Sequence, residues 1–171
     1  MEQTYYFIII GALIVEYLLS TISSVLNMNS ITTTIPDGFQ EFYDDKKYSK
    51  SQEYLKDKTK LGLYSSTFSL ILTLIVIQFG LFGFLDEFVR LNSTNYIISG
   101  LLFFGILFVI NDILNIPFSL YSTFVIEEKY GFNKTSIHTF ISDKFKGYGL
   151  TIVLGSAVIV PIFYFFNTFQ D

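Results

Sequence analysis

The side chains of this chain that could do chemistry gather in one stretch, between Pro117 and Phe145. The stretch holds six acidic or basic residues from Glu127 to Lys144, a Gly-Phe-Asn turn and the only histidine, His138. Acids, bases and an imidazole are the groups from which hydrolytic and metal sites are built. Apolar runs long enough to cross a membrane flank the stretch on both sides, so we interpret the chain as a membrane scaffold that presents it.

Several classes of function are disfavoured by the composition. With one histidine and no cysteine, the chain cannot supply paired axial ligands to a haem, and its carboxylates lack the Glu-x-x-His spacing of a di-metal bundle. It has 15 acidic against 11 basic residues, which gives no electrostatic footprint for nucleic acid. No residue is therefore predicted to be a metal ligand or a catalytic group within this chain.

The hydrophobic pattern predicts the fold. Hydrophobic residues make up 51% of the 171 positions, and a span of the bilayer needs ~20 apolar residues in a helix whose backbone groups are satisfied internally. We predict an all-α integral membrane protein with about four transmembrane helices and a short cytosolic interfacial helix, forming a single transmembrane domain over residues 1–171. The predicted spans are residues 5–26, 61–85, 96–116 and 148–169.

Basic residues between these spans predict the orientation. Lysine and arginine number none before the first span, six in residues 27–60, one in residues 86–95 and four in residues 118–147. The positive-inside rule then places the segments 27–60 and 117–147 in the cytoplasm and both termini outside. The membrane would be the inner membrane in a bacterium and the endoplasmic reticulum in a eukaryote.

Two polar features lie within the predicted spans. Glu16 is near the middle of the first span, where a carboxylate either faces a functional cavity or is protonated and hydrogen-bonded to a neighbouring helix. Asn111, Asp112 and Asn115 share one helix face just before Pro117, which must kink or end the helix. Their face either lines a cavity that water or substrate reaches, or joins helices through hydrogen bonds.

The hydrophilic segments contain a turn and two expected helices. Pro36 and the following Asp-Gly pair predict a turn, and a helix is expected from Ser49 without a break into the second span. The charge run at residues 44–47 is interpreted as a solvated face. After Gly131, one of Asn133, Thr135 or Ser136 would cap the short interfacial helix, which also carries His138 as an interfacial polar residue.

The same region resembles a known family. The run Ile126-Glu-Glu-Lys-Tyr-Gly-Phe-Asn-Lys-Thr135, with Pro117, Tyr121 and Phe124 before it, is similar to the signature of the amino-terminal membrane region of CAAX prenyl protease 1. Members of that family are zinc metalloproteases that remove the last three residues after a prenylated cysteine. Further agreement is found at Pro36, Tyr43-Asp44, Tyr48, Ser51-Gln52-Glu53-Tyr54 and Lys58-Thr59-Lys60.

The resemblance implies a helical barrel around a large water-filled chamber, with zinc held in the carboxy-terminal half by His-Glu-x-x-His and a later glutamate. This chain departs from that pattern, because His138 is followed by Thr-Phe-Ile-Ser. Zinc hydrolysis needs about three protein ligands and an open water position. We therefore expect no cofactor in this chain, and zinc only in the full-length protein.

The resulting hypothesis is that the chain is the amino-terminal membrane half of such a protease. Its expected partners are the lipid bilayer, the missing carboxy-terminal catalytic half and a peptide or protein substrate. Glu16, Asn111, Asp112 and Asn115 would line the chamber. A structural brace for the catalytic half would comprise Tyr121, Glu127, Glu128, Gly131, Phe132, Asn133, Lys134 and Thr135, although local ion pairing and capping would also explain the charged members. The alternative is a free-standing, non-catalytic membrane module that binds a partner protein or lipid.

Overall fold

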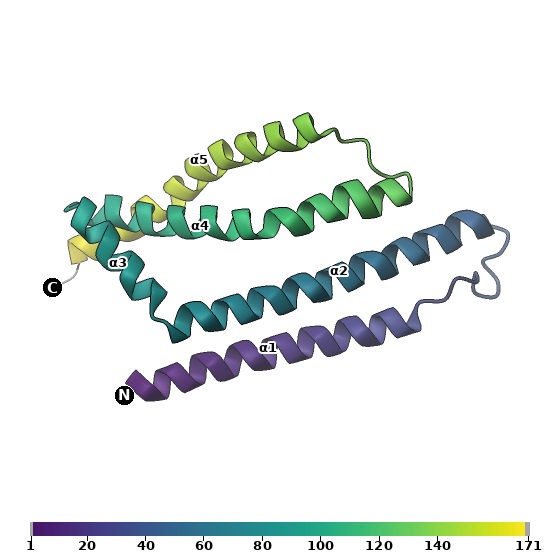
Figure 1. The fold of residues 1–171 in the computed structure, drawn as a ribbon, viewed down its shortest axis with the longest axis horizontal. Helices are drawn as coiled ribbons and strands as arrows, with labels where there is room; N and C mark the ends of the chain where they lie inside the picture. Colours follow the sequence, from purple (N-terminus) through teal and green to yellow (C-terminus); the bar gives the residue numbers. More distant parts are fainter. Residues whose placement is uncertain (1, 170–171) are drawn as a thin grey trace. The chain divides into compact units, whose positions relative to one another are not determined.

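The computed structural model describes residues 2–169, and every regular element within them is a helix. In chain order these are α1 (Glu2–Ser30), α2 (Asp45–Gln78), α3 (Leu81–Asn92), α4 (Tyr96–Tyr121), the π-helical segment η1 (Ser122–Glu127) and α5 (Ile137–Phe169) (Figure 1). Four helical stretches are long and apolar enough to cross a membrane: Gln3–Ser30, Asp45–Gln78, Tyr96–Glu127 and Ile137–Phe169. The predicted fold class is confirmed. The predicted domain limits at residues 1 and 171 lie outside the described residues.

Contacts divide the chain into two compact units. The first comprises the described residues up to Val76 together with Pro117–Asn133, and the second comprises Ile77–Ile116 and the described residues from Lys134 onward. That the chain is a single transmembrane domain stays a prediction.

In the first unit, α1 and α2 run antiparallel (Figure 1), and the Tyr17 hydroxyl lies 2.7 Å from Thr67 Oγ1 between them. The predicted turn is present, because Phe39 N donates to Pro36 O at 3.2 Å. The helix expected from Ser49 begins earlier, at Asp45. The charge run at residues 44–47 is exposed, as expected of a solvated face, and it also caps the start of α2, because Asp44 Oδ1 accepts a hydrogen bond from Lys47 N at 2.9 Å.

In the second unit, α4 packs against α5 at a glycine. A Cβ atom added to Gly100 would lie 2.5 Å from ring atoms of Phe163, so only glycine allows this close approach. Asn95 caps α4, since its Oδ1 accepts hydrogen bonds from Ile97 N at 3.0 Å and Ile98 N at 3.1 Å.

The predicted boundaries differ from the structure in three places. The second span was expected to reach residue 85, but α2 ends at Gln78, because Gly80 adopts a left-handed conformation (φ +65°) from which α3 starts. Pro117 does not end its helix: α4 continues to Tyr121 and on through η1. The expected interfacial helix is not separate, because it forms the first turns of α5, where Ser136 Oγ accepts from Thr139 N at 3.1 Å.

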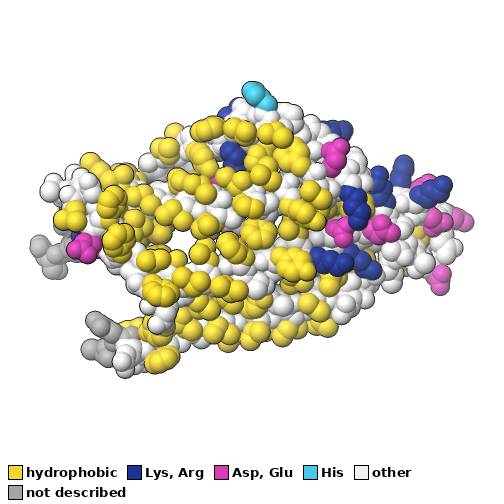
Figure 2. Space-filling model, in the orientation of Figure 1, with side chains coloured by type: hydrophobic (Ala, Val, Ile, Leu, Met, Phe, Trp, Pro, Cys, Tyr) yellow, Lys and Arg dark blue, Asp and Glu magenta, His cyan; other side chains and the backbone are white. Residues whose placement is uncertain are grey.

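Hydrophobic side chains cover most of α1 and the later part of α2 in Figure 2, as expected for helices that face lipid or further helices. Exposed examples include Phe7, Leu19 and Tyr64, which are between 65% and 71% exposed. Charged side chains gather toward the start of α2 in the same view. The apolar parts of the long helices carry polar groups at few positions, and those positions are the candidates for a functional site.

Candidate functional site

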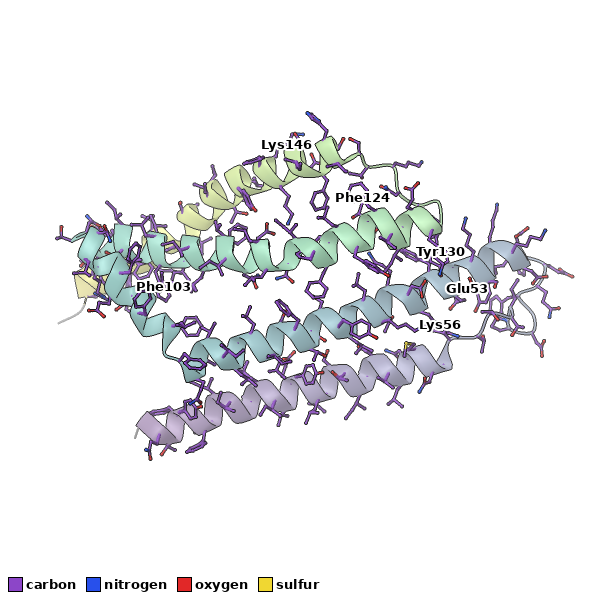
Figure 3. The ribbon with its side chains drawn as sticks, viewed as in Figure 1. Glu53, Lys56, Phe103, Phe124, Tyr130 and Lys146 are labelled. Carbon is purple, nitrogen blue, oxygen red and sulfur yellow. The ribbon has the colours of Figure 1, made fainter. Side chains whose placement is uncertain are left out.

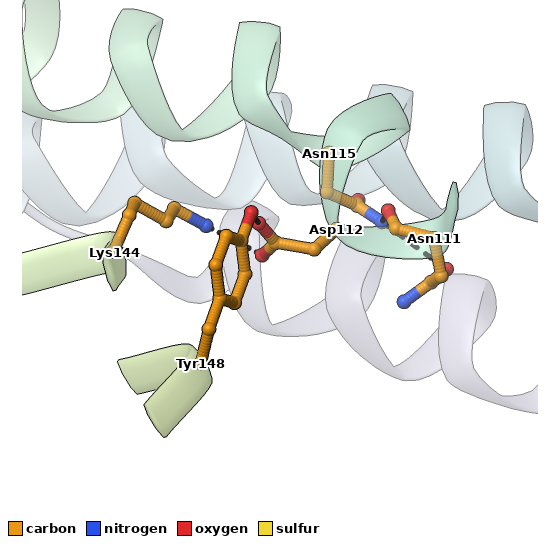
Figure 4. A network of polar contacts seen from close by, with 5 residues as sticks. All are labelled: Asn111, Asp112, Asn115, Lys144 and Tyr148. Atoms are coloured by element: carbon orange, nitrogen blue, oxygen red, sulfur yellow. Dashed lines mark hydrogen bonds and ion pairs between the residues drawn. The ribbon is translucent and has the colours of Figure 1, made fainter. Parts of the chain in front are cut away.

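A partly buried polar cluster joins α4 to α5 in the second unit (Figure 4). Lys144 Nζ donates to Asp112 Oδ1 at 2.5 Å, and Tyr148 Oη donates to Asp112 Oδ2 at 2.6 Å. The side chains of Lys144 and Asp112 are only 26% and 19% exposed. Because Lys144 and Tyr148 are one helical turn apart on α5, both reach the same carboxylate.

This arrangement favours anchoring over acid–base chemistry. Both carboxylate oxygens of Asp112 already accept hydrogen bonds from the charged or phenolic donors of α5. A general base needs a free acceptor within reach of a substrate proton. The cluster is therefore a charge-assisted link between two membrane helices. Of the two alternatives that the sequence offered for Asp112, the structure favours hydrogen bonding between helices over lining a cavity.

The two asparagines beside Asp112 bond to each other. Asn115 Nδ2 donates to the Asn111 backbone oxygen at 2.8 Å and to its Oδ1 at 3.3 Å. Asn111 itself is exposed on α4. This face of α4 thus combines a helix-joining carboxylate with an outward-facing carboxamide, which lipid would solvate poorly.

Glu16 lies on the exposed side of α1, in the first unit. Its neighbour Tyr17 faces α2 and Thr67. Among the residues that the structure describes, none forms a hydrogen bond or an ion pair with the Glu16 side chain, so the hydrogen-bonded alternative finds no partner within this part of the chain. A carboxylate at that depth requires water, a proton or a further polypeptide.

A second polar cluster joins α2 to η1 and to the turn after it, all within the first unit. Lys58 Nζ donates to Ser122 Oγ at 2.6 Å and to Glu127 Oε1 at 3.1 Å. The preceding residue of α2 makes a second link, because Asp57 Oδ2 accepts from Lys129 Nζ at 2.7 Å and from Tyr130 Oη at 2.8 Å. Adjacent residues of α2 therefore hold both ends of the Glu127–Tyr130 segment.

The environment of this cluster fixes its protonation states. The hydrogen bond to Asp57 raises the pKa of Lys129, and burial raises the pKa of Tyr130. Lys129 therefore stays charged and Tyr130 stays a neutral donor at physiological pH. Asp57 thus pairs with Lys129, 72 positions away in sequence, and forms no ion pair with Lys60 one turn along α2.

Aromatic rings of α2 and of the segment after η1 pack against one another beside the cluster. Tyr130 is 4% exposed and lies against α2 (Figure 3), with its ring centroid 5.6 Å from that of Tyr54. The Phe132 ring also meets the Tyr54 ring edge-on, with the centroids 5.0 Å apart, and Lys50 Nζ lies 5.7 Å from the Phe132 centroid. Such pairs contribute ~0.5–1.5 kcal/mol each beyond the area they bury.

The predicted turn at Gly131 is built as the sequence indicates. Gly131 has a φ of +66°, a conformation that glycine adopts without strain. Phe132 N and Asn133 N donate to Glu127 O at 2.8 Å and 3.2 Å, and Asn133 Nδ2 donates to Glu128 Oε2 at 3.0 Å. The motif residues Glu127 to Asn133 thus form one turn that is closed by its own hydrogen bonds.

The other residues singled out from the sequence differ in their exposure. Tyr121 is exposed and lines a groove beside α2. Lys134 and His138 are exposed, and Thr135 is partly buried in the segment before α5. Within residues 2–169, no group of three or more histidine, cysteine, aspartate or glutamate side chains could hold a metal ion. The residues present do not fit a zinc site.

Five contributors to these clusters were not singled out as site residues from the sequence: Tyr54, Asp57, Lys58, Lys144 and Tyr148. A signal existed for Lys144, because a carboxylate at the end of a membrane span requires a cation and Lys144 precedes the next span by one turn. No comparable signal links Lys58 to Glu127, which is 69 residues away.

Comparison with known proteins shows which family the chain is similar to. A family model described as the CAAX prenyl protease amino-terminal region, with five membrane helices, matches residues 24–171. The probable CAAX prenyl protease 1 of Schizosaccharomyces pombe is 38% identical over 133 residues, which cover 70% of this chain and 28% of the relative. The CAAX prenyl protease 1 homologue of Arabidopsis thaliana is 29% identical over 164 residues, covering 91% of this chain and 39% of the relative.

A solved structure is also similar. The crystal structure of S. mikatae Ste24p superposes with a TM-score of 0.84 and 25% sequence identity, covering 96% of this chain and 40% of that one. The chain therefore spans well under half the length of the relatives and of the structure that it matches.

Proposed function

The chain belongs to the CAAX prenyl protease family, whose amino-terminal membrane domain it forms, and we propose that this domain lines an intramembrane chamber and supports a zinc-dependent catalytic region. The observation that supports the chamber is the exposure of Glu16 and Asn111 on membrane-spanning helices. Polar groups at such positions face water or protein in membrane proteins. A chamber filled with water would hydrate both.

The catalytic region would lie in sequence that this chain does not contain. Zinc hydrolysis requires about three ligands, whereas this chain has one histidine and no cysteine. A carboxy-terminal region with His-Glu-x-x-His and a further glutamate would bind the zinc and cleave the peptide or protein substrate. The substrate would carry a prenylated cysteine, as the family name implies.

The turn from Glu127 to Thr135 would be the structural brace for that region. Its backbone is fixed by Gly131 and by two hydrogen bonds to Glu127 O, while Lys58 and Asp57 anchor it to α2. A rigid turn with exposed Glu128, Phe132 and Lys134 can seat a second polypeptide at little entropic cost. We place this turn and residues 27–60 in the cytoplasm, because they carry most of the lysines.

Measurements of zinc content and of peptide cleavage test whether the zinc site lies in the carboxy-terminal region and not in this chain. We expect the purified chain to hold far less than one zinc ion and to cleave no peptide, and its assembly with a carboxy-terminal region carrying His-Glu-x-x-His to bind one zinc and become active. In that assembly, His138→Ala should leave zinc content and cleavage rate unchanged, because His138 is exposed and belongs to no group of possible metal ligands within residues 2–169. One tightly bound zinc per isolated chain would overturn the proposal in favour of a site within the chain.

A further inference from the structure

A groove in the first unit runs between α2 and the helix formed by the end of α4 and η1. Its volume is about 630 Å³, and its walls are mainly apolar and aromatic, with Leu61 and Tyr64 on one side and Phe118, Tyr121 and Val125 on the other. Three of these side chains remain well exposed within the described chain: Tyr64 at 71%, Tyr121 at 52% and Val125 at 46%. The groove is thus an apolar surface without an occupant from its own unit.

The two walls run antiparallel, which gives the groove a polar end and an apolar end. The ion pair of Asp57 with Lys129 marks one end, and the ring contact of Phe68 with Phe118, at 5.4 Å, marks the other. Lys60 stands at the polar end, directly before the apolar run that begins with Leu61. Such a transition from charged to apolar sequence is where a helix passes from the membrane surface into the hydrocarbon.

The charge at the polar end is positive and partly uncompensated. The carboxylate of Asp57 is occupied by Lys129 and Tyr130. Lys60 is exposed, and among the described residues none forms a hydrogen bond or an ion pair with its ammonium group. One carboxylate and two ammonium groups line this end of the groove, so a net charge of +1 remains for a ligand.

We propose that this groove binds one anionic phospholipid. Lys60 contacts the phosphate at the membrane surface, and an acyl chain lies along Leu61, Tyr64, Phe118 and Val125. A ligand with one anionic end and a long apolar body fits a groove of this polarity, and basic recesses between membrane helices hold anionic headgroups in this way. The tyrosines suit the level between headgroup and hydrocarbon. The inference depends on membrane insertion and not on the proposed protease activity.

Competition between two lipids tests the proposal. The full chain in mild detergent is mixed with equal amounts of dioleoyl phosphatidylglycerol and dioleoyl phosphatidylcholine, and retained lipid is measured by native mass spectrometry. We expect one phosphatidylglycerol to be retained in preference to phosphatidylcholine. Lys60→Gln should lower that preference about fivefold. The matched control Lys47→Gln changes charge equally on an exposed lysine of α2 that lies outside the groove, and it should retain the preference.

The apolar part of the groove is tested by a second variant. Val125→Trp fills the groove without a change of charge and should reduce retention of both lipids, with the helical circular dichroism spectrum unchanged. The proposal is overturned if neither lipid is retained, if the two lipids are retained equally by the unchanged chain, or if Lys60→Gln and Lys47→Gln behave alike. Lipid retention in Val125→Trp equal to that of the unchanged chain would place the lipid elsewhere.

Discussion

Lys144→Met is expected to lower the free energy of unfolding by ~2 kcal/mol, because it leaves the Asp112 carboxylate without its cation between two membrane helices. Breaking a fully buried pair by removing one partner costs ~3–5 kcal/mol. The smaller figure reflects the remaining exposure of the pair and the retained hydrogen bond from Tyr148. Titration with sodium dodecyl sulfate, followed by circular dichroism, measures the loss.

Lys146→Met is the matched control for this prediction. Lys146 is on the same helix and pairs with Asp143 at 3.1 Å, but the two side chains are 73% and 60% exposed (Figure 3). An exposed pair at this spacing contributes less than ~1 kcal/mol. The double variant Asp112→Asn with Lys144→Met should recover part of the lost stability. Equal losses in Lys144→Met and Lys146→Met would contradict the anchoring role of Asp112.

Tyr130→Ala is expected to destabilise the chain by ~3 kcal/mol. The ring is almost fully buried, packs edge-on against Tyr54 and donates a hydrogen bond to Asp57 at 2.8 Å. Removing a buried aromatic side chain costs ~3–5 kcal/mol, because it removes apolar burial and leaves a cavity. The same detergent titration measures the change.

Two variants separate the ring from the hydroxyl. Tyr130→Phe keeps the ring and removes only the hydrogen bond, so a loss of ~1 kcal/mol is expected. Tyr164→Ala removes a tyrosine that is 61% exposed and should change stability by less than ~0.5 kcal/mol. If Tyr130→Ala were as mild as Tyr164→Ala, the turn after η1 would not be anchored through Tyr130.

The membrane helices were predictable because their apolar runs are long and the bilayer allows only one backbone solution. The helix ends were less predictable. Gly80 allows either a bend or a close helix approach, so its presence alone did not predict the left-handed conformation that divides the expected second span into α2 and α3. Pro117 was expected to kink or end its helix, and the helix does not end there but continues into a π-helical segment. Packing against neighbouring helices sustains such irregular turns, and a local sequence pattern does not encode it.

The site was predictable in its residues but not in its partners. The shared face of Asn111, Asp112 and Asn115 follows from helical spacing alone. Lys144 was missed because its helix was expected to lie in the interface, whereas α5 is continuous and directs Lys144 toward α4. Asp57 pairs with Lys129 and Lys58 pairs with Glu127, at separations of 72 and 69 positions. Helical spacing relates only residues within a few turns of one another, so it could not predict these pairs.

The chamber is tested most directly by the reaction of introduced cysteines with a charged, membrane-impermeant thiol reagent. The chain has no cysteine of its own, so Asn111→Cys and the control Ile113→Cys each provide one thiol from this chain, on different faces of α4 and both exposed. In membranes containing the chain assembled with its catalytic region, we expect Asn111→Cys to react at least about tenfold faster than Ile113→Cys, because water reaches only the former. Equal rates, or reaction at position 113 alone, would contradict a water-filled chamber lined by this face of α4.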